Sequence, residues 1–431
     1  MIVGGKMQIE NILPLKPMQT SMMYQYFTNV ESKLNSEILV YKIHGCPNVE
    51  QLGEACTLST IHNAIKSVFV WKKTDFPLQI ILSAKPLALK VVNTDTVEKL
   101  IDEIWDLSLD ITKNPYQIYY LKNPDSQYFV IRTHHILLDG WSQAIWLRDV
   151  ILLYDKIKRA ESLCIHRRDY ADYVKDFWLQ ASKNKNYWIN HLDGFKGVSK
   201  TKNRSNKQRV KLYRSAVLNN RIYLTQNQRK MTFSQCFYAI WVIYLIMANQ
   251  TNDVAFNIVA SGRGIGRDYE LDLVGMLINT VPARFKVDLS WTVEQYLAFI
   301  KCSVLEILIH QEVNTIDLLE TMNNNGLINI ETCLDIQNYP ISSIENITAA
   351  DFSLSLTEHK FCSNAPFILA VRTDQSTMEV ELEFCYDSGL YNNDAICKII
   401  DLIEKIARWL SDGQKKNIKK IMECGIYDKQ L

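Results

Sequence analysis

Two adjacent histidines, His134 and His135, lie at the end of an apolar run, and Asp139 and Gly140 follow after three apolar residues. An imidazole takes up a proton near physiological pH, so it suits proton transfer from an attacking amine or hydroxyl. Asp139 stands four residues after His135 and can orient the region. Amides that follow Gly140 at a helix N-terminus can face a developing oxyanion. The spacing His-His-x-x-x-Asp-Gly therefore predicts a base held in place, in preference to a pair of metal ligands.

The elements that position these residues are a strand over 128–136, a tight turn, and a helix over 141–157. Side chains alternate along a strand, so we expect the two histidines to point to opposite sides and only one to face a given cavity. A pair of core histidines without chemistry is the alternative. The sequence has no Gly-x-Ser-x-Gly elbow, and Ser142 suits a helix N-cap better than a nucleophile. Direct transfer without a covalent enzyme intermediate is favoured.

Length and composition indicate a two-domain globular protein. The chain has 431 residues, which is more than one ordinary domain needs, and its formal net charge of +1 suggests neither nucleic acid nor a membrane surface as a partner. Its 10 cysteines form no Cys-x-x-Cys pair, which argues against a zinc ribbon or redox motif and favours the cytoplasm. The apolar run 236–248 is shorter than the roughly 20 residues of a membrane span, so we predict a buried helix.

The pattern along the chain predicts two α+β lobes, over residues 1–193 and 215–431, joined by a basic linker over 194–214. That linker, which holds no acidic residue, fits a solvated connection, and docking of an acidic partner is the alternative. Strands are expected over 37–44, 78–83, 117–121, 128–136, 217–224, 254–261, 328–336 and 378–386. Helices are expected over 49–70, 96–106, 170–192, 233–248, 291–312 and 393–410, with capping boxes at Thr232/Gln235 and Thr292/Gln295.

These residues resemble the condensation domains of nonribosomal peptide synthetases, whose signature is His-His-x-x-x-Asp-Gly, and most of all the type that joins two L-configured units. Trp188 matches a tryptophan that precedes the inter-lobe linker of the family. The resemblance runs from about residue 13 to the C-terminus, and five ordered motifs make a chance match improbable. The other four motifs lie at residues 15–19, 261–263, 274–284 and 310–312.

The resemblance implies two chloramphenicol-acetyltransferase-like lobes that form a V-shaped pseudo-dimer with a central tunnel. Donor and acceptor would arrive as thioesters on the phosphopantetheine arms of carrier proteins, with no permanently bound cofactor or metal. His135 would face the tunnel and take the amine proton or position the amine, and His134 would support it. Asp139 would be structural and would pair with an arginine of the second lobe, Arg284 or Arg263. Gly140 would permit the turn and offer its amide near the thioester carbonyl, and Asn279 and Trp188 would support the site.

One motif departs from the family pattern. The usual Arg-His-x-x-Leu-Arg segment has Ile61 and Lys66 in place of its arginines. This is either tolerated drift in a supporting element or a sign of altered carrier docking or lowered activity. His310 is expected to pack or to stabilise a helix end.

The resemblance predicts an acyltransferase that forms an amide bond in antibiotic or other secondary-metabolite biosynthesis. One alternative is a free-standing amide or ester synthase that uses a soluble amine or alcohol. Another, of a different class, is a non-catalytic recruitment platform. We expect a cytoplasmic monomer, either stand-alone or cut from a larger synthetase.

Overall fold

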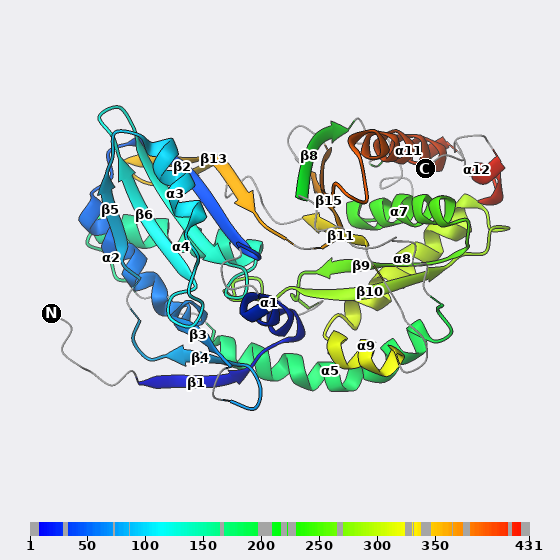
Figure 1. Ribbon diagram of the computed structural model, residues 1–431, viewed down its shortest axis with the longest axis horizontal. Helices are drawn as coiled ribbons and strands as arrows, with labels where there is room; N and C mark the ends of the chain where they lie inside the picture. Colours follow the sequence, from blue (N-terminus) through cyan, green and yellow to red (C-terminus); the bar gives the residue numbers. More distant parts are fainter. Residues whose placement is uncertain are drawn as a thin grey trace. The chain divides into compact units, whose positions relative to one another are not determined.

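The computed structural model divides into two compact units, each made of several stretches of the chain (Figure 1). Unit 1 comprises Met1–Leu179, Gly266–Ile278 and Tyr339–Ser363, and unit 2 comprises Gln180–Ile265, Asn279–Asn338 and Asn364–Leu431. The residues that the structure describes are 8–28, 33–71, 74–85, 87–163, 168–196, 209–216, 222, 230–264, 270–323, 330, 332–337, 346–363, 365–373, 380–412 and 416–423.

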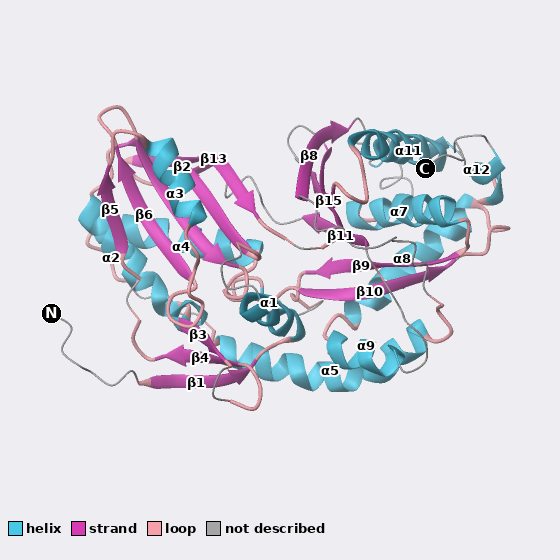
Figure 2. Ribbon diagram, viewed as in Figure 1, coloured by secondary structure: helices cyan, strands magenta, loops and turns pink. Residues whose placement is uncertain are grey.

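Unit 1 is built on a six-stranded sheet, in which β5 pairs parallel with β6 and the other neighbours pair antiparallel (Figure 2). Its order is β12 (Asn346–Thr348), β13 (Phe352–Phe361), β2 (Ser36–Gly45), β7 (Gln127–His134), β6 (Tyr116–Lys122) and β5 (Leu89–Asn93). The strands expected over 117–121 and 128–136 are present as β6 and β7, which pair antiparallel as a hairpin. The predicted contiguous lobes are wrong for β12 and β13, which belong to the second half of the sequence but pair within this sheet.

Helices cover both faces of this sheet because its central strands are apolar on both sides. Leu39 and Ile131 pack in one cluster with residues of α2 (Val49–Leu58) and α4 (Gly140–Lys158). Ile38 and Val130 pack in another with Ile101 of α3 (Val97–Asp106). Odd and even positions of β2 thus face different helices, as strand geometry requires. The unit also holds α1 (Pro17–Thr28) and a small antiparallel sheet of β1 (Ile9–Pro14), β4 (Leu78–Leu82) and β3 (Ser67–Val70).

The helix expected over 49–70 ends at Leu58. Ser59 donates its hydroxyl to the carbonyl of Cys56 at 2.6 Å, and two short 3₁₀ turns follow, at Ser59–Ile61 and Asn63–Lys66. Residue 62 between them has extended backbone angles, φ −74° and ψ 93°. The sequence Ser-Val-Phe-Val then forms β3, which pairs with β4, because its β-branched and aromatic residues suit a sheet.

Unit 2 is built on a second six-stranded sheet. Its order is β10 (Asn279–Lys286), β9 (Asp253–Ala260), β11 (Thr332–Gln337), β14 (Phe367–Thr373), β15 (Val380–Asp387) and β8 (Arg209–Ala216). β11 pairs parallel with both of its neighbours, and the other pairs are antiparallel. Pro282 is tolerated in β10 because this strand lies at the end of the sheet order.

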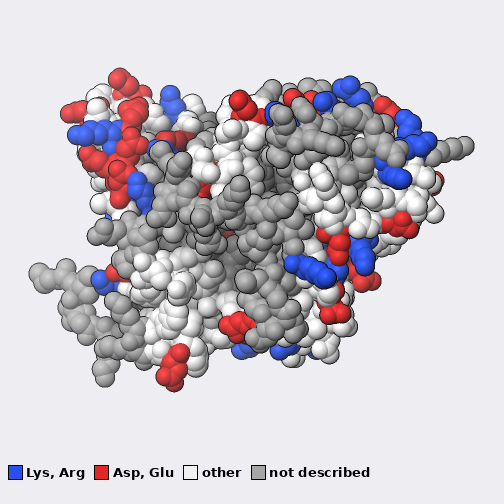
Figure 3. Space-filling view, turned by 45° about the vertical axis from the view of Figure 1, so that its right-hand side comes forward, with Lys and Arg blue, Asp and Glu red and all other residues white. Residues whose placement is uncertain are grey.

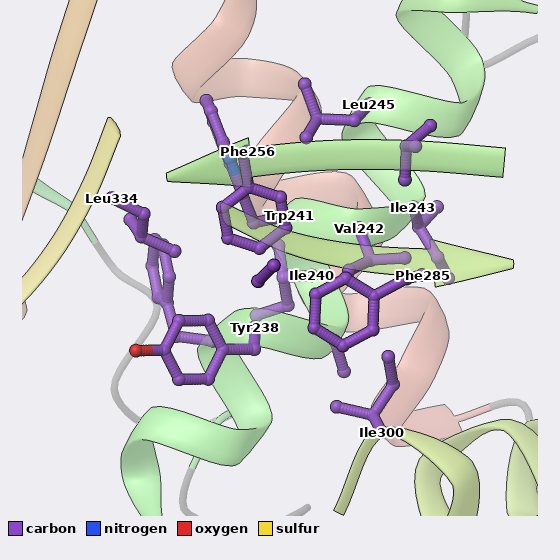
Figure 4. Packing of buried hydrophobic residues seen from close by; sticks show 14 of the residues in the cluster. Tyr238, Ile240, Trp241, Val242, Ile243, Leu245, Phe256, Phe285, Ile300 and Leu334 are labelled. Carbon is purple, nitrogen blue, oxygen red and sulfur yellow. The ribbon is translucent and has the colours of Figure 1, made fainter. Parts of the chain in front are cut away.

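The core of unit 2 forms around α7 (Phe233–Asn249), which is apolar on nearly all sides (Figure 4). Phe256 of β9 and Phe285 of β10 stack beneath it with ring centroids 5.5 Å apart, and Ile300 of α8 (Val293–Ile309) completes the layer. Both predicted capping boxes are present, at the first turns of α7 and α8. The unit also contains α9 (Thr315–Asn323), α11 (Asn393–Asp412) and α12 (Lys419–Glu423), and α5 (Tyr170–Leu192) runs from unit 1 into unit 2.

The predicted linker and the strand after it are only partly described. Residues 209–214 are not linker but the start of β8, which pairs antiparallel with β15. Residues 197–208, and most of the strand expected over 217–224, lie outside the described residues.

Charged side chains of both signs occur on the surface drawn in Figure 3, in keeping with the net charge of +1. In the part of the chain that the structure describes, every helix is too short or too polar to cross a bilayer.

The packing of α8 in unit 2 predicts that alanine substitutions at a buried and at an exposed position differ strongly in their effect on stability. Ile300→Ala should lower the free energy of unfolding by about 2–5 kcal/mol, because Ile300 is fully buried and its loss leaves a cavity. Leu305→Ala, at a side chain that is 45% exposed, should change it by less than about 0.5 kcal/mol. Urea unfolding followed by circular dichroism would measure both, and equal losses would contradict this packing.

Candidate active site

His134 is the last residue of β7 and lies in the protein interior. Its side chain is 2% exposed, and its Nδ1 accepts a hydrogen bond from the amide of Ile136 at 3.1 Å. The ring also meets Tyr26 edge-on, with centroids 6.1 Å apart. Burial and the neighbouring charge of His135 lower the pKa of His134 to about 3. A second proton on Nδ1 would also cost the bond from Ile136, so His134 is neutral at ordinary pH and acts through packing.

His135 has a different environment from His134. Its amide donates to the carbonyl of Asn35 at 2.7 Å, and its side chain is 13% exposed. The imidazole Nε2 lies 3.3 Å from a carboxylate oxygen of Glu37, and the ring meets Phe361 edge-on with centroids 4.8 Å apart. Of the two histidines, His135 is the one beside a carboxylate and partly open to solvent. Its role as the base stays a prediction.

Asp139 is the N-cap residue of α4, and its carboxylate binds residues 277–278, a segment of unit 1 that is distant in sequence. Its Oδ1 accepts from the amide of Ser142 at 2.7 Å, and its Oδ2 accepts from the amides of Leu277 and Ile278 at 2.8 and 3.2 Å. The hydroxyl of Ser142 donates to the carbonyl of Gly275 at 2.7 Å, and the Gly275 amide donates back at 3.1 Å. Ser142 therefore binds this segment, and the carboxylate of Asp139 caps the helix whose first residue is Gly140.

Gly275 fits closely against Tyr170 in the same segment. A Cβ on Gly275 would meet two ring carbons of Tyr170 at 2.3 and 2.4 Å. The Tyr170 hydroxyl donates to the carbonyl of Met276 at 3.0 Å, so the ring cannot move without losing that bond. Only glycine fits at this position.

Arg284 binds groups within its own unit, and its pairing with Asp139 stays a prediction. Its Nε and Nη2 donate to the two carboxylate oxygens of Asp253 at 2.8 and 2.7 Å. Its Nη1 donates to the carbonyls of His191 and Asp193 at 3.3 and 2.5 Å. Arg284 and Asp253 lie on adjacent strands of unit 2, so a bidentate pair forms locally and uses the guanidinium.

Arg263 is buried and donates from Nη1 to the carbonyl of Ser261 at 3.2 Å. Its pairing with Asp139 stays a prediction.

Trp188 and Asn279 both bind the segment that follows α8 in unit 2. Trp188 donates from Nε1 to the carbonyl of His310 at 2.8 Å. The Asn279 amide donates to the carbonyls of Gln311 and Val313 at 2.9 and 3.1 Å, and Gln311 accepts from the amide of Gly262 at 3.0 Å. Three motifs of the second half thus meet through hydrogen bonds between side chains and backbone groups.

His310 itself ends α8 and stacks on Tyr187 with centroids 3.9 Å apart. The predicted packing and helix-end role is confirmed.

The segment that departs from the family pattern is well anchored in unit 1. His62 and Asp149 form a buried pair with 2.8 Å between Nε2 and Oδ2. Lys66 pairs with Glu10, and Ile61 is 39% exposed. These contacts favour a supporting element that tolerates the lost arginines.

Two residues near His135 escaped sequence reasoning, Glu37 of β2 and His359 of β13. His359 Nε2 lies 2.6 Å from Oε1 of Glu37. Glu37 could have been noticed in the sequence, because it is an acidic residue next to an apolar strand run, and the structure shows it to be 6% exposed. His359 gives no such signal, because it comes from a strand 322 positions away. Among the described residues, no group of His, Cys, Asp and Glu could hold a metal ion.

Solved structures similar to this chain establish the class of its fold. The starter condensation domain of rhizomide synthetase matches with a TM-score of 0.76 and 14% identity, over 95% of this chain and 96% of that one. A four-domain nonribosomal peptide synthetase bound to AMP and glycine matches with a TM-score of 0.79 and 12% identity, over 100% of this chain and 35% of that one. The chain therefore has the fold of condensation domains, in agreement with the predicted α+β lobes.

The sequence comparisons then identify the family. Bacitracin synthase 3 of Bacillus licheniformis is 23% identical over 96% of this chain and 7% of its own length. Surfactin synthase subunit 3 of Bacillus subtilis is 22% identical over 92% of this chain and 32% of its own length, so the chain spans a minor part of both relatives. The Condensation domain model matches residues 9–422, and the chain belongs to the condensation domain family. Members of this family are acyltransferases that form amide bonds in nonribosomal peptide synthetases, beside carrier domains.

The buried His134 predicts a pH dependence of stability. The unfolded chain takes up this proton near pH 6.5, whereas the folded protein resists it until about pH 3, so the unfolded state binds more protons between these values. The contribution of His134 is thus fully present above pH 6.5 and is lost as the pH falls toward 3. We expect His134→Gln to reduce the slope of unfolding free energy against pH in this window by up to about 1.4 kcal/mol per pH unit.

Chemical unfolding at several pH values between about 4.5 and 6.5 would measure that slope. His44→Gln, at an exposed histidine, is the control and should keep the slope of the unchanged protein. Identical slopes for His134→Gln and the control would show that His134 is not buried in its neutral form.

The contact between Gly275 and Tyr170 predicts that an alanine at position 275 destabilises the protein. Gly275→Ala should destabilise the protein by roughly 1–3 kcal/mol or more, because the added Cβ overlaps the ring and displaces the backbone that binds Asp139 and Ser142. Gly53→Ala in α2 is the matched control, since its nearest neighbour atom is 3.8 Å from the added Cβ. That change should stabilise by about 0.5–1 kcal/mol through helix propensity. A melting temperature of Gly275→Ala at or above that of the control would refute the close fit.

Proposed function

We propose that this chain forms an amide bond between an acyl or aminoacyl thioester on a donor carrier protein and the amine of an acceptor on a second carrier. The observation that carries the proposal is His135 beside Glu37 at the end of β7, in a chain that belongs to the condensation domain family over residues 9–422. Transfer of the acyl group is direct. The serine of the motif, Ser142, has its hydroxyl engaged with Gly275 and is not placed as a nucleophile.

In the proposed reaction the amine nitrogen bonds to the thioester carbonyl carbon and the carbon–sulfur bond breaks. The amine proton passes to His135 and then to the departing sulfur, which leaves as the free thiol of the carrier arm. Proton transfer of this kind needs a neutral imidazole before attack and tolerates an imidazolium afterward. The carboxylate of Glu37, 3.3 Å from His135 Nε2, favours the imidazolium.

The start of α4 supplies the second part of the proposed site. Gly140 is its first residue, and the amides at a helix N-terminus favour negative charge on a carbonyl oxygen. Asp139 has its carboxylate turned to Ser142, Leu277 and Ile278, so it holds this turn and takes no proton from the substrate. Gly140 thus supports the proposed oxyanion contact.

The proposal extends to the delivery of the substrates. Phosphopantetheine arms on donor and acceptor carriers would bring both thioesters through the tunnel implied by the resemblance. The proposal includes no bound cofactor and a monomer in the cytoplasm. Free buried thiols at Cys56 and Cys236 are compatible with a reducing compartment.

Reconstitution with loaded carriers tests the proposal. The unchanged protein should release an amide product from at least one pair in a panel of acyl- and aminoacyl-loaded carriers, followed by mass spectrometry. His135→Ala should slow this by about 10²–10⁴-fold, since it removes the base. His44→Ala, at an exposed histidine, should react at the unchanged rate.

Equal rates for His135→Ala and the unchanged protein would remove His135 from the chemistry. Product with soluble amines or alcohols, and none with acceptor carriers, would favour the free-standing synthase. Carrier binding without any product would favour the recruitment platform.

A further inference from the structure

Three neighbouring strands of unit 1 place two imidazoles on either side of one carboxylate. β13, β2 and β7 are adjacent in the sheet, with Glu37 on β2 in the middle. His359 of β13 lies opposite Leu39, so it is a diagonal neighbour of Glu37 on the same face. Thr133 of β7 lies directly opposite Glu37, and His135 follows it two residues later. The sheet register therefore brings these residues together.

The contacts divide the two oxygens of the Glu37 carboxylate between different partners. Oε1 lies 2.6 Å from Nε2 of His359. Oε2 lies 3.3 Å from Nε2 of His135 and also accepts from the side chain of Gln143 of α4. Gln143 in turn contacts the hydroxyl of Thr133 at 3.1 Å. His359 thus contacts Oε1 of the carboxylate, and Oε2 faces His135 and Gln143.

We infer that Glu37 is a positioning residue for His135, held in its turn by His359, and that it stabilises the imidazolium formed when His135 takes a proton. This inference rests on the proposed function, because it assigns a partner to the base of that reaction. Neither residue lies in the motifs that carry the family resemblance. The ring of Phe361 fixes the other side of the His135 imidazole by its edge-on contact.

The charge of Glu37 persists although the residue is buried. Burial raises the pKa of Glu37, but the charge of His135 and the hydrogen bond of His359 outweigh it and bring the pKa down to about 2. A carboxylate that stays ionised can pair with an imidazolium at any pH at which the reaction runs. The cost of burying this charge is offset by its three side-chain partners, and a buried carboxylate without them would be strongly destabilising.

The other charged groups near the cluster are engaged elsewhere. On β13, Lys360 pairs with Glu358 at 2.7 Å and with Asp102 of α3 at 2.8 Å. On β7, Arg132 donates to the carbonyls of Trp105 and Leu107 at the C-terminal end of α3. From α4, the group that faces Glu37 is the neutral amide of Gln143. His134 is neutral, and the carboxylate of Glu37 lies 3.3 Å from Nε2 of His135.

The test is Glu37→Gln in the full chain, which keeps the size of the side chain and removes its charge. Proton-detected spectra of ¹⁵N-histidine protein would follow both imidazoles against pH without any substrate, with resonances assigned from His135→Gln and His359→Gln. We expect the imidazole signals of His135 and His359 to depend on pH differently in Glu37→Gln and in the unchanged protein, because the substitution removes the charge between the two rings. Unchanged titrations would overturn the inference, whatever the protein is found to catalyse.

The kinetic readout uses the loaded-carrier assay. Glu37→Gln should lower kcat on the order of tenfold, leave KM within about twofold, and move the acidic limb of the pH–rate profile to lower pH. Glu103→Gln is the matched control, because its side chain is 60% exposed on α3, and it should leave titrations and rates unchanged. His359→Gln removes a side chain that is 28% exposed and should act in the same direction with smaller effect.

A double-mutant cycle separates positioning from general damage to the fold. If Glu37 acts through His135, then adding Glu37→Gln to His135→Ala should not lower the residual rate further. An equal loss in both backgrounds would show a merely structural role and would refute the inference. Absence of product from the unchanged protein would instead refute the proposed function, and the spectra would still decide whether Glu37 controls His135.

Discussion

One buried carboxylate controls the geometry of the proposed site. Asp139 is fully buried and accepts hydrogen bonds from the amides of Ser142, Leu277 and Ile278. Hydrogen bonds to a charged group contribute about 1.5–3 kcal/mol each, and the loss of all three would leave an uncompensated charge in the interior. The start of α4 and residues 275–278 can therefore move only together. The turn between His135 and α4 is fixed because both of its ends are fixed, one by the sheet and one by Asp139.

That constraint leaves two neighbouring histidines in unlike surroundings. His134 has its Nδ1 taken by the amide of Ile136 and is neutral through burial. His135 has a carboxylate 3.3 Å away and is partly open to solvent. The same side chain type thus serves packing at one position and carries the proposed chemistry at the next. The difference comes from which groups the sheet brings near each ring, and not from the residues themselves.

Much of this could be predicted from the sequence where the signal is local. The hairpin before His134, the helix after Gly140 and the capping boxes of α7 and α8 depend on residues within a few positions of each other. The errors are non-local. The sequence gives no sign that β13 joins the sheet of unit 1, so Glu37 and His359 went unnoticed as neighbours of His135. The sequence also gives no sign of the bidentate pair that Arg284 forms with Asp253 on the adjacent strand.

Several side chains of the motifs that carry the family resemblance form hydrogen bonds with main-chain groups. Asp139 and Ser142 bind main-chain groups of residues 275–278, and Asn279 and Gln311 bind main-chain groups in unit 2. Such contacts fix where a loop lies, but they do not tune a proton transfer. The side chains of Glu37 and Phe361 contact the His135 ring, and Gln143 contacts Glu37. A family signature can therefore identify the fold and a candidate base, while the proposed partner of that base comes from the sheet register of the structure.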